Sequence, residues 1–262
     1  MNIVVCVKQV PDTNEVKIDE EKGTLIREGV PSIINPEDKT AIEKAVKLKE
    51  EFGGQVTVIS MGPPQAKDAL IEAYAIGADQ AILLSDKKFA GSDTWATAYT
   101  LSQAIKEVGD FDLIFCGRQA IDGDTAQVGP QVAENLDIPQ ITYVRELNIE
   151  GEKVTAKRKL EEGYSIIETE LPVLLTVLGD LNKPRYPSIK RIVDAFNNEN
   201  TVKVWNADDF AVDDDKLGLD ASPTQVYDTF VPTRDHEAEI LEGTVEEKVG
   251  KLIDKLKEEK VV

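Results

Sequence analysis

The chain has 262 residues, with 49 acidic against 30 basic side chains and a formal net charge of −19. This acidity excludes a nucleic-acid-binding protein and a protein held on an anionic membrane surface, because phosphate groups would be repelled. No stretch approaches the roughly 20 apolar residues of a membrane span, and no basic, apolar leader opens the sequence, so we expect a cytoplasmic protein without a membrane anchor.

The first half of the chain alternates apolar runs with segments of helical spacing. The first helix has Asn35 as its expected cap and Pro36 at its first position. A short hairpin is expected in the first crossover, and the last helix of this half ends near residue 136. This order predicts an α/β fold in which a parallel twisted sheet carries helices on both faces, as in Rossmann-like proteins. The expected strands cover residues 2–7, 55–60, 80–84 and 112–116; the helices cover 36–52, 64–75, 94–108 and 131–136; the hairpin covers 16–19 and 24–27.

Neither a metal site nor a catalytic side chain stands out. Cys6 and Cys116 lie inside apolar runs, which favours packed, reduced thiols. The single histidine, His236, lies in a polar stretch that is typical of a solvated surface. We therefore assign no catalytic role to any of these residues.

Residues 117–130 are the stretch with the clearest chemical potential. They form a loop of small residues between a predicted strand and a predicted helix, and Gly117, Gly123 and Gly129 leave the backbone uncovered. A pyrophosphate could therefore approach the amide N–H groups at the start of that helix. A tight strand-to-helix turn without a ligand is the alternative, because small residues are common after strands. The carboxyl ends of the other parallel strands share this edge of the sheet, which favours a ligand site.

The second half of the chain changes period after residue 141. Three alternating segments predict an antiparallel meander within residues 142–170, and residues 171–177 are apolar enough to return to the sheet. A proline-rich loop then leads into a short helix over residues 189–196. The loop and the start of the helix carry a basic cluster, which is either a docking patch or a solvated charged loop. It consists of Lys183, Arg185, Lys190 and Arg191.

The last part of the chain looks unlike the rest. Residues 206–235 combine acidic runs with scattered prolines and show no sustained period, which is typical of an extended arm. A helix with one apolar stripe follows over residues 245–259, and it could dock on a partner or on its own chain. We therefore divide the chain into residues 1–205, with the hairpin 142–170 and the loop 179–191, and an arm with a helix, residues 206–262.

Several motifs in fixed order resemble the beta subunit of electron transfer flavoproteins, over almost the whole chain. They are residues 5–10, the Asn35-Pro36 helix start with its body 41–49, and residues 77–79, 117–122, 157–163 and 182–187. The resemblance implies an adenine-nucleotide α-hydrolase-like fold and a heterodimer with an alpha subunit that carries its own FAD. It also implies an adenine nucleotide along the strand ends of this chain, and a dehydrogenase that docks near residues 179–191. In that case the arm and helix of residues 206–262 would pack on the alpha subunit.

The family motifs transfer to individual residues of this chain. Arg158 resembles the arginine that faces the flavin of the alpha subunit, and Leu181 resembles the anchor of the docking loop, with Arg185 and Tyr186 beside it. The residues that the resemblance implies as nucleotide contacts are Cys6, Asn35, Pro36, Glu37, Asp38, Met61, Ile121, Asp122, Gly123, Asp124, Thr125, Ala126, Gln127, Val128 and Gly129.

The loop 122–130 resembles the electron-bifurcating branch of that family, whose beta subunit binds a second FAD. Gly123, Thr125 and Ala126 leave room for a pyrophosphate to continue into a second nucleotide half. That branch takes hydride from NADH and sends electrons to ferredoxin or flavodoxin and, through the alpha subunit, to an acyl-CoA or enoyl-CoA dehydrogenase. As an oxidoreductase the chain would therefore act only within the complex, with the chemistry supplied by the cofactor.

Two other interpretations remain from the sequence. A simple electron carrier would hold AMP as a structural piece in the same site. An ATP-cleaving enzyme of the same general fold would need a Gly-rich phosphate loop after the first strand, and residues 8–12 contain no glycine.

Overall fold

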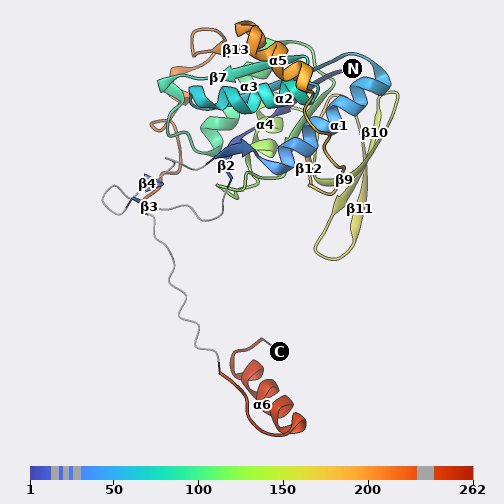
Figure 1. The fold of residues 1–262 in the computed structure, drawn as a ribbon, viewed down its shortest axis with the longest axis vertical. Coiled ribbons are helices and arrows are strands. Elements are labelled where there is room, and N and C mark those ends of the chain that lie inside the picture. The colour runs from blue at the N-terminus through green and yellow to red at the C-terminus, as the bar shows by residue number, and fades with distance from the viewer. Residues whose placement is uncertain (13–17, 20–23, 26–30, 229–238, 262) are drawn as a thin grey trace. The chain divides into compact units, whose positions relative to one another are not determined.

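Figure 1 shows the computed structural model, which describes residues 1–12, 18–19, 24–25, 31–228 and 239–261. The chain forms two compact units, Met1–Tyr227 and Asp228–Val262. The first unit contains a nine-stranded sheet covered by helices. The second unit carries one helix, α6 (Val245–Glu258), which begins with a capping box made by Thr244 and Glu247.

The central sheet is parallel over most of its width and has the order β11-β10-β9-β12-β8-β1-β6-β7-β13. The strands from β9 to β13 in this order pair in parallel, whereas β10 and β11 continue from β9 as an antiparallel hairpin. The strands are β1 (Asn2–Cys6), β6 (Gln55–Met61), β7 (Gln80–Leu84), β8 (Leu113–Gly117), β9 (Gln140–Glu150), β10 (Lys153–Lys159), β11 (Tyr164–Glu170), β12 (Val173–Val177) and β13 (Val202–Trp205).

Helices cover both faces of the sheet, which confirms the expected α/β class. One hydrophobic core lies under α1 (Pro36–Phe52) and α2 (Lys67–Ile76), and α5 (Ile189–Asn197) packs on α2. The opposite core lies under α3 (Thr94–Val108) and α4 (Val128–Leu136). The smaller elements are the pairs β2 (Gln9–Pro11) with β5 (Ser32–Ile34) and β3 (Ile18–Asp19) with β4 (Thr24–Leu25), and the 3-10 turns η1 (Pro64–Ala66), η2 (Lys87–Phe89), η3 (Glu199–Thr201) and η4 (Asp214–Lys216).

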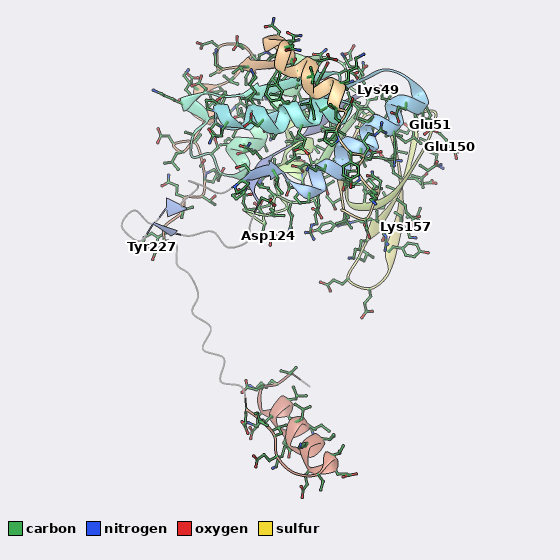
Figure 2. All side chains as sticks on the ribbon, viewed as in Figure 1. Lys49, Glu51, Asp124, Glu150, Lys157 and Tyr227 are labelled. Carbon is green, nitrogen blue, oxygen red and sulfur yellow. The ribbon has the colours of Figure 1, made fainter. Side chains whose placement is uncertain are left out.

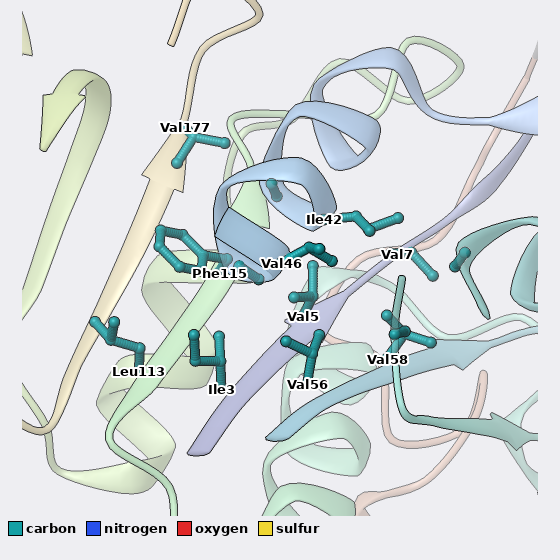
Figure 3. Close-up of a cluster of buried hydrophobic side chains, with 14 of the residues drawn as sticks. Ile3, Val5, Val7, Ile42, Val46, Val56, Val58, Leu113, Phe115 and Val177 are labelled. Atoms are coloured by element: carbon teal, nitrogen blue, oxygen red, sulfur yellow. The ribbon is translucent and has the colours of Figure 1, made fainter. Parts of the chain in front are cut away.

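Helix α1 shows how the sequence builds this architecture. Pro36 occupies its first turn with two acidic residues, and Gly53 ends it at a φ of 72°. Ile42 and Val46 of its apolar stripe are buried and face Val5 and Phe115 of the sheet, as the close-up shows (Figure 3). Burying each such side chain contributes roughly 1.5–3 kcal/mol, so α1 is firmly seated on β1 and β8.

Some boundaries differ from the expected ones. Helix α4 begins at Val128 rather than at residue 131, and β13 was not expected at all. β13 pairs in parallel with β7 and forms one edge of the sheet. The expected hairpin in the first crossover exists as the β3–β4 pair, although residues 16, 17, 26 and 27 lie outside the described residues, as does His236.

The segment after β13 belongs to the first unit and packs on its sheet and helices as far as residue 224. Ala207, Phe210 and Leu217 are buried in the core under α3, and the Phe210 ring lies against Phe89 and Trp205. The compact unit therefore runs on to Tyr227, beyond the boundary at residue 205 that the sequence suggested. The apolar residues that hold this segment are widely spaced in the sequence, and their spacing matches neither a helix nor a strand. Residues 229–235 of the expected arm lie outside the described residues.

Candidate nucleotide-binding site

The strand order reverses between β1 and β8. From β1 the chain adds β6 and β7 on one side and then returns to place β8 on the other side of β1. In open α/β sheets such a reversal leaves a crevice beyond the carboxyl ends of the two strands, and ligands bind there. Cys6 and Cys116 are register partners at these ends, and both are buried.

Asp38 ties the ends of the two strands together. Its Oδ2 accepts the backbone N–H of Lys8 at 2.8 Å, and its Oδ1 accepts the N–H of Gly117 at 2.9 Å. Burial raises the pKa of this carboxyl to about 7, against the opposing hydrogen bonds from Lys8, Asn35 and Gly117. Both oxygens are thus engaged within the protein, and Asp38 shapes the crevice.

Asn35 holds the loop that follows β8. Its Nδ2 donates to the carbonyl of Gln119 at 2.9 Å, and its Oδ1 accepts the N–H of Ile121 at 3.1 Å. The expected cap is therefore wrong in its detail: α1 begins after Asn35, but no side chain caps its first turn. The Asn35 side chain makes two hydrogen bonds to the loop backbone instead of one to the backbone of α1. These bonds fix residues 119–121 beside the strand ends.

The three glycines of the loop have different roles. A Cβ on Gly117 would lie 2.3 Å from Asp38 Oδ1, and a Cβ on Gly129 would lie 2.6 Å from Thr176 Cγ2. These two glycines allow close packing within the protein. A Cβ on Gly123 would meet nothing within 4 Å, so packing among the described residues does not explain this glycine.

The start of α4 is open to an anion. Gln127 occupies its cap position, and no side chain accepts from the first turn. In contrast, Asp93 caps α3 by accepting from the N–H groups of Trp95 and Ala96. The partial positive charge at an uncapped helix start attracts phosphate. Asp124 and Ala126 before it adopt left-handed φ values of 52° and 53°, a costly backbone for residues with a Cβ.

The acidic side chains of the loop are paired within the protein. Lys8 Nζ lies 2.8 Å from Asp122 Oδ1, and Gln119 Nε2 donates to Asp124. Neither acid caps α4. Because both carboxylates are neutralised or bonded, they repel a phosphate at the start of α4 less strongly than free carboxylates would.

Glu37 contributes to the same wall of the crevice. Its Oε2 accepts the N–H of Gln119 at 3.2 Å and lies 3.4 Å from Arg118 Nε. Burial raises the pKa of Glu37, and the neighbouring Arg118 opposes that rise. The sequence had not singled out Arg118 or Gln119 for these contacts, since the partners are about 80 residues apart in the chain.

The remaining expected nucleotide contacts lie at the same edge of the sheet or on the hairpin. Met61 ends β6 and is partly buried, and Val128 packs partly against the core under α3 and α4. Thr125 is exposed on the loop. Arg158 lies on β10, where the register to β9 shifts, and its buried Nε has no hydrogen-bond partner among the described residues. No contact described in the structure joins Arg158 to the loop after β8.

The expected docking residues all lie in the loop after β12, but their environments differ. Leu181 is partly buried and packs against the core. Arg185 is bound by Glu43 at 2.8 Å and Glu50 at 2.6 Å, and these hydrogen bonds raise the pKa of the guanidinium. Tyr186 is 93% exposed.

An apolar face on α5 continues from Tyr186 and was missed in the sequence. Ile189, Val193 and Phe196 are 79%, 51% and 71% exposed. Their spacing of four and three residues, directly after the loop, is the signal that could have found it. Two residues of the basic cluster serve the fold instead: Arg185 as above, and Arg191, which donates to the carbonyl of Tyr74 at 2.7 Å.

Comparison with known proteins decides the family. A family model described as "Electron transfer flavoprotein domain" matches residues 22–209. The "Electron transfer flavoprotein subunit beta" of Thermoanaerobacterium thermosaccharolyticum is 58% identical over the full length of both chains. The chain belongs to the electron transfer flavoprotein family, as a beta subunit.

Two other relatives carry the names of reductases. The "Caffeyl-CoA reductase-Etf complex subunit CarD" of Acetobacterium woodii is 52% identical over the full length of both chains. The "Acryloyl-CoA reductase electron transfer subunit gamma" of Anaerotignum propionicum is 47% identical, again over both full lengths. As a beta subunit, the chain is expected to pair with an alpha subunit.

Two further properties bear on function. Within the described residues, no helix has the length and apolar character to cross a membrane. The same residues contain no group of three or more His, Cys, Asp or Glu side chains placed to share a metal ion.

Proposed function

We propose that this beta subunit binds FAD in the crevice beyond β1 and β8 and takes part in electron bifurcation. The observation that carries the proposal is the combination of an open Gly123 with an uncapped α4. Gly123 has free space where a Cβ would stand, and the start of α4 offers an anion site to the pyrophosphate. AMP needs only a terminal phosphate pocket, whereas FAD needs this outward path.

The residues of the chain would position the cofactor. Asn35 and Asp38 hold the loop and the strand ends, the first turn of α4 receives the phosphates, and Cys6 and Met61 border the adenosine half. Lys8, paired with Asp122, balances charge at the loop. A bound FAD would supply hydride acceptance from NADH and one-electron transfer to ferredoxin or flavodoxin and to the alpha subunit.

The names of two relatives support this proposal. Caffeyl-CoA reductase and acryloyl-CoA reductase are complexes that act on unsaturated acyl-CoA esters, and their subunits are similar to this chain over its full length. By this similarity the partner of the present chain is an acyl-CoA or enoyl-CoA dehydrogenase. Arg158, with its unpartnered Nε, is the residue we assign to face the flavin of the alpha subunit.

The dehydrogenase would dock on the loop 179–191 and the adjoining face of α5. Tyr186, Ile189 and Phe196 present apolar area outward, while the Arg185 clamp fixes the loop beneath them. Exposed aromatic and aliphatic anchors of this kind dominate binding energy at protein interfaces. Arg185 is thus a positioning residue in this proposal, and Leu181 anchors the loop to the core.

Counting bound nucleotides tests the cofactor. The complex with the alpha subunit is purified and denatured, and the released FAD and AMP are quantified by chromatography. Two FAD and no AMP per heterodimer support the proposal, whereas one FAD and one AMP identify an electron carrier with a structural nucleotide.

A loop variant tests the position of the site. Gly123→Asp with Thr125→Cys places a charge and bulk where the pyrophosphate would continue, so we expect loss of the second FAD with little loss of stability. Glu51→Ala, at an exposed side chain of α1, is the control for a change outside the loop in the same complex. Unchanged FAD content in the loop variant would contradict the assignment.

A surface variant tests the docking face. Phe196→Ser removes an exposed anchor, and we expect the affinity for the dehydrogenase to fall about tenfold or more. Val204→Ser, at an exposed apolar side chain on β13, is the matched control and should leave the affinity unchanged. Equal affinities for both variants would exclude the α5 face.

A further inference from the structure

Asp93 joins two parts of the chain that lie far apart in sequence. Its Oδ1 accepts the N–H groups of Trp95 at 2.9 Å and Ala96 at 3.1 Å, which caps α3. Its Oδ2 accepts from both the N–H of Thr224 at 3.0 Å and the Thr224 hydroxyl at 2.8 Å. One carboxylate therefore fixes the start of α3 and the end of the packed segment after β13.

The backbone of Asp93 strengthens the same junction. Its N–H donates to Ser222 Oγ at 2.8 Å, and that hydroxyl donates to the carbonyl of Gly218 at 2.8 Å. Although burial acts to raise the pKa of Asp93, the hydrogen bonds from Ala96, Thr224 and Trp95 outweigh it and lower the pKa. The group is thus an ionised acceptor with donors on two sides at neutral pH.

The residue after Asp93 reaches the loop of the candidate site. Thr94 Oγ1 donates to Gln127 Oε1 at 3.0 Å. Gln127 is the cap residue of α4, where a phosphate would bind. Thr224 is bonded to Asp93, and Thr94 is bonded to Gln127. Since Asp93 and Thr94 are consecutive residues, a single peptide bond links the two sets of hydrogen bonds.

Exposed side chains follow Thr224. Val226 is 83% exposed and Tyr227 is fully exposed, and Tyr227 is also the last residue of the first compact unit (Figure 2). Upstream of Thr224 the segment has further anchors, including the ion pair of Lys88 with Asp214 and the bond from the N–H of Asp213 to the Tyr99 hydroxyl. Residues 222–224 therefore depend on Asp93 more than the preceding residues do.

We propose that Asp93 is a positioning residue that couples occupancy of the nucleotide site to the fixation of residues 222–224. This inference rests on the proposed function of the crevice. A nucleotide that orders Gln127 and the first turn of α4 also orders Thr94 and the start of α3. The carboxylate of Asp93 is then held in the orientation that binds Thr224. Coupling of this kind is reciprocal, so the fixed segment strengthens nucleotide binding by the same factor.

Hydrogen exchange at the Thr224 amide measures the coupling. The full complex with the alpha subunit is depleted of nucleotide in the beta subunit and studied alone, with AMP and with FAD. We expect the nucleotide that binds to slow exchange of this amide about fivefold or more. Thr94→Val should keep nucleotide affinity within about tenfold of the native value, because one partly exposed hydrogen bond is lost, and should abolish the slowing.

Two controls separate coupling from general stability. Thr97→Val is the same change one turn further along α3 and should retain the slowing. Thr224→Val should lower nucleotide affinity about fivefold in equilibrium dialysis, as reciprocity requires.

The outcomes distinguish the two proposals. If AMP or FAD binds but native Thr224 exchange changes less than twofold, or if Thr94→Val retains the slowing, the coupling is excluded. If neither nucleotide binds, the proposed site itself fails, and the coupling fails with it.

Discussion

The loops after β8 and after β12 leave the same edge of the sheet, and α1 holds both of them by different means. Asn35 and Asp38 at the start of α1 bond to the backbone around the first loop, and both side chains are buried. Further along α1, Glu43 and Glu50 bind the guanidinium of Arg185 in the second loop. Bonds from buried side chains to backbone fix positions closely, as a binding crevice requires. An ion pair with an exposed partner holds a surface with less energy.

The largest difference in the free energy of unfolding is expected between a change at Asp38 and a change on the exposed face of α1. Asp38→Ala leaves two N–H groups at the strand ends without their acceptor, so we expect a loss of about 3 kcal/mol in the free energy of unfolding. Urea unfolding at pH 7 measures it. Glu51→Ala, an exposed change near the end of the same helix (Figure 2), should stay within about 0.5 kcal/mol of the native value. A loss below about 1 kcal/mol for Asp38→Ala would show that its two hydrogen bonds do not hold the strand ends together.

The pH dependence of stability tests the same carboxyl. Its pKa in the folded protein is raised to about 7, above the ordinary value of 3.8, so the folded state binds more protons between these values. Stability from this group is therefore full below about pH 4 and falls as the pH rises to about 7. We expect the native protein to lose stability relative to Asp38→Asn over this range in urea unfolding. A difference between the two that grows in the opposite direction would show a depressed pKa.

The clamp in the second loop should be weaker. Arg185→Met removes the main partner of Glu43, whose side chain is only 3% exposed, although Lys47 remains 3.3 Å away. We expect a loss of about 2 kcal/mol, because one carboxylate is left buried with a single exposed partner. Urea unfolding measures this loss as well. Arg145→Met breaks a more exposed ion pair with Asp180 and is the control; equal losses in both variants would contradict a special role for Glu43.

The outer half of that clamp should contribute least. Glu50→Gln affects an exposed carboxylate, so we expect a loss of about 0.5 kcal/mol at low salt and less at 1 M salt, where the Debye length is about 3 Å. Urea unfolding at the two ionic strengths measures it. The effect of Asp38→Ala should not change with salt, and a similar salt dependence at both sites would remove the distinction between the two loops.

The sequence predicted the sheet because its strands are continuous apolar runs and its helices have strong start and stop signals. It also predicted the site edge, since parallel strands end together. It did not predict the role of Asn35, because a helix cap and a loop clamp use the same residue at the same position. It missed the packing of residues 206–224 because Phe210 and Leu217 are isolated apolar residues without a period. The Arg185 clamp was missed because its partners are 142 and 135 residues away.

The candidate site beyond the carboxyl ends of β1 and β8 is assembled from residues 6–8, 35–38 and 117–129, with Thr176 against Gly129. These segments meet only when the whole sheet has formed, so the unfolded chain offers no such site. A ligand present at one hundred times its dissociation constant would then add about 2.7 kcal/mol to the stability of the first unit. Cofactor supply would in this way decide how long the subunit survives in the cell, as well as whether it can carry electrons.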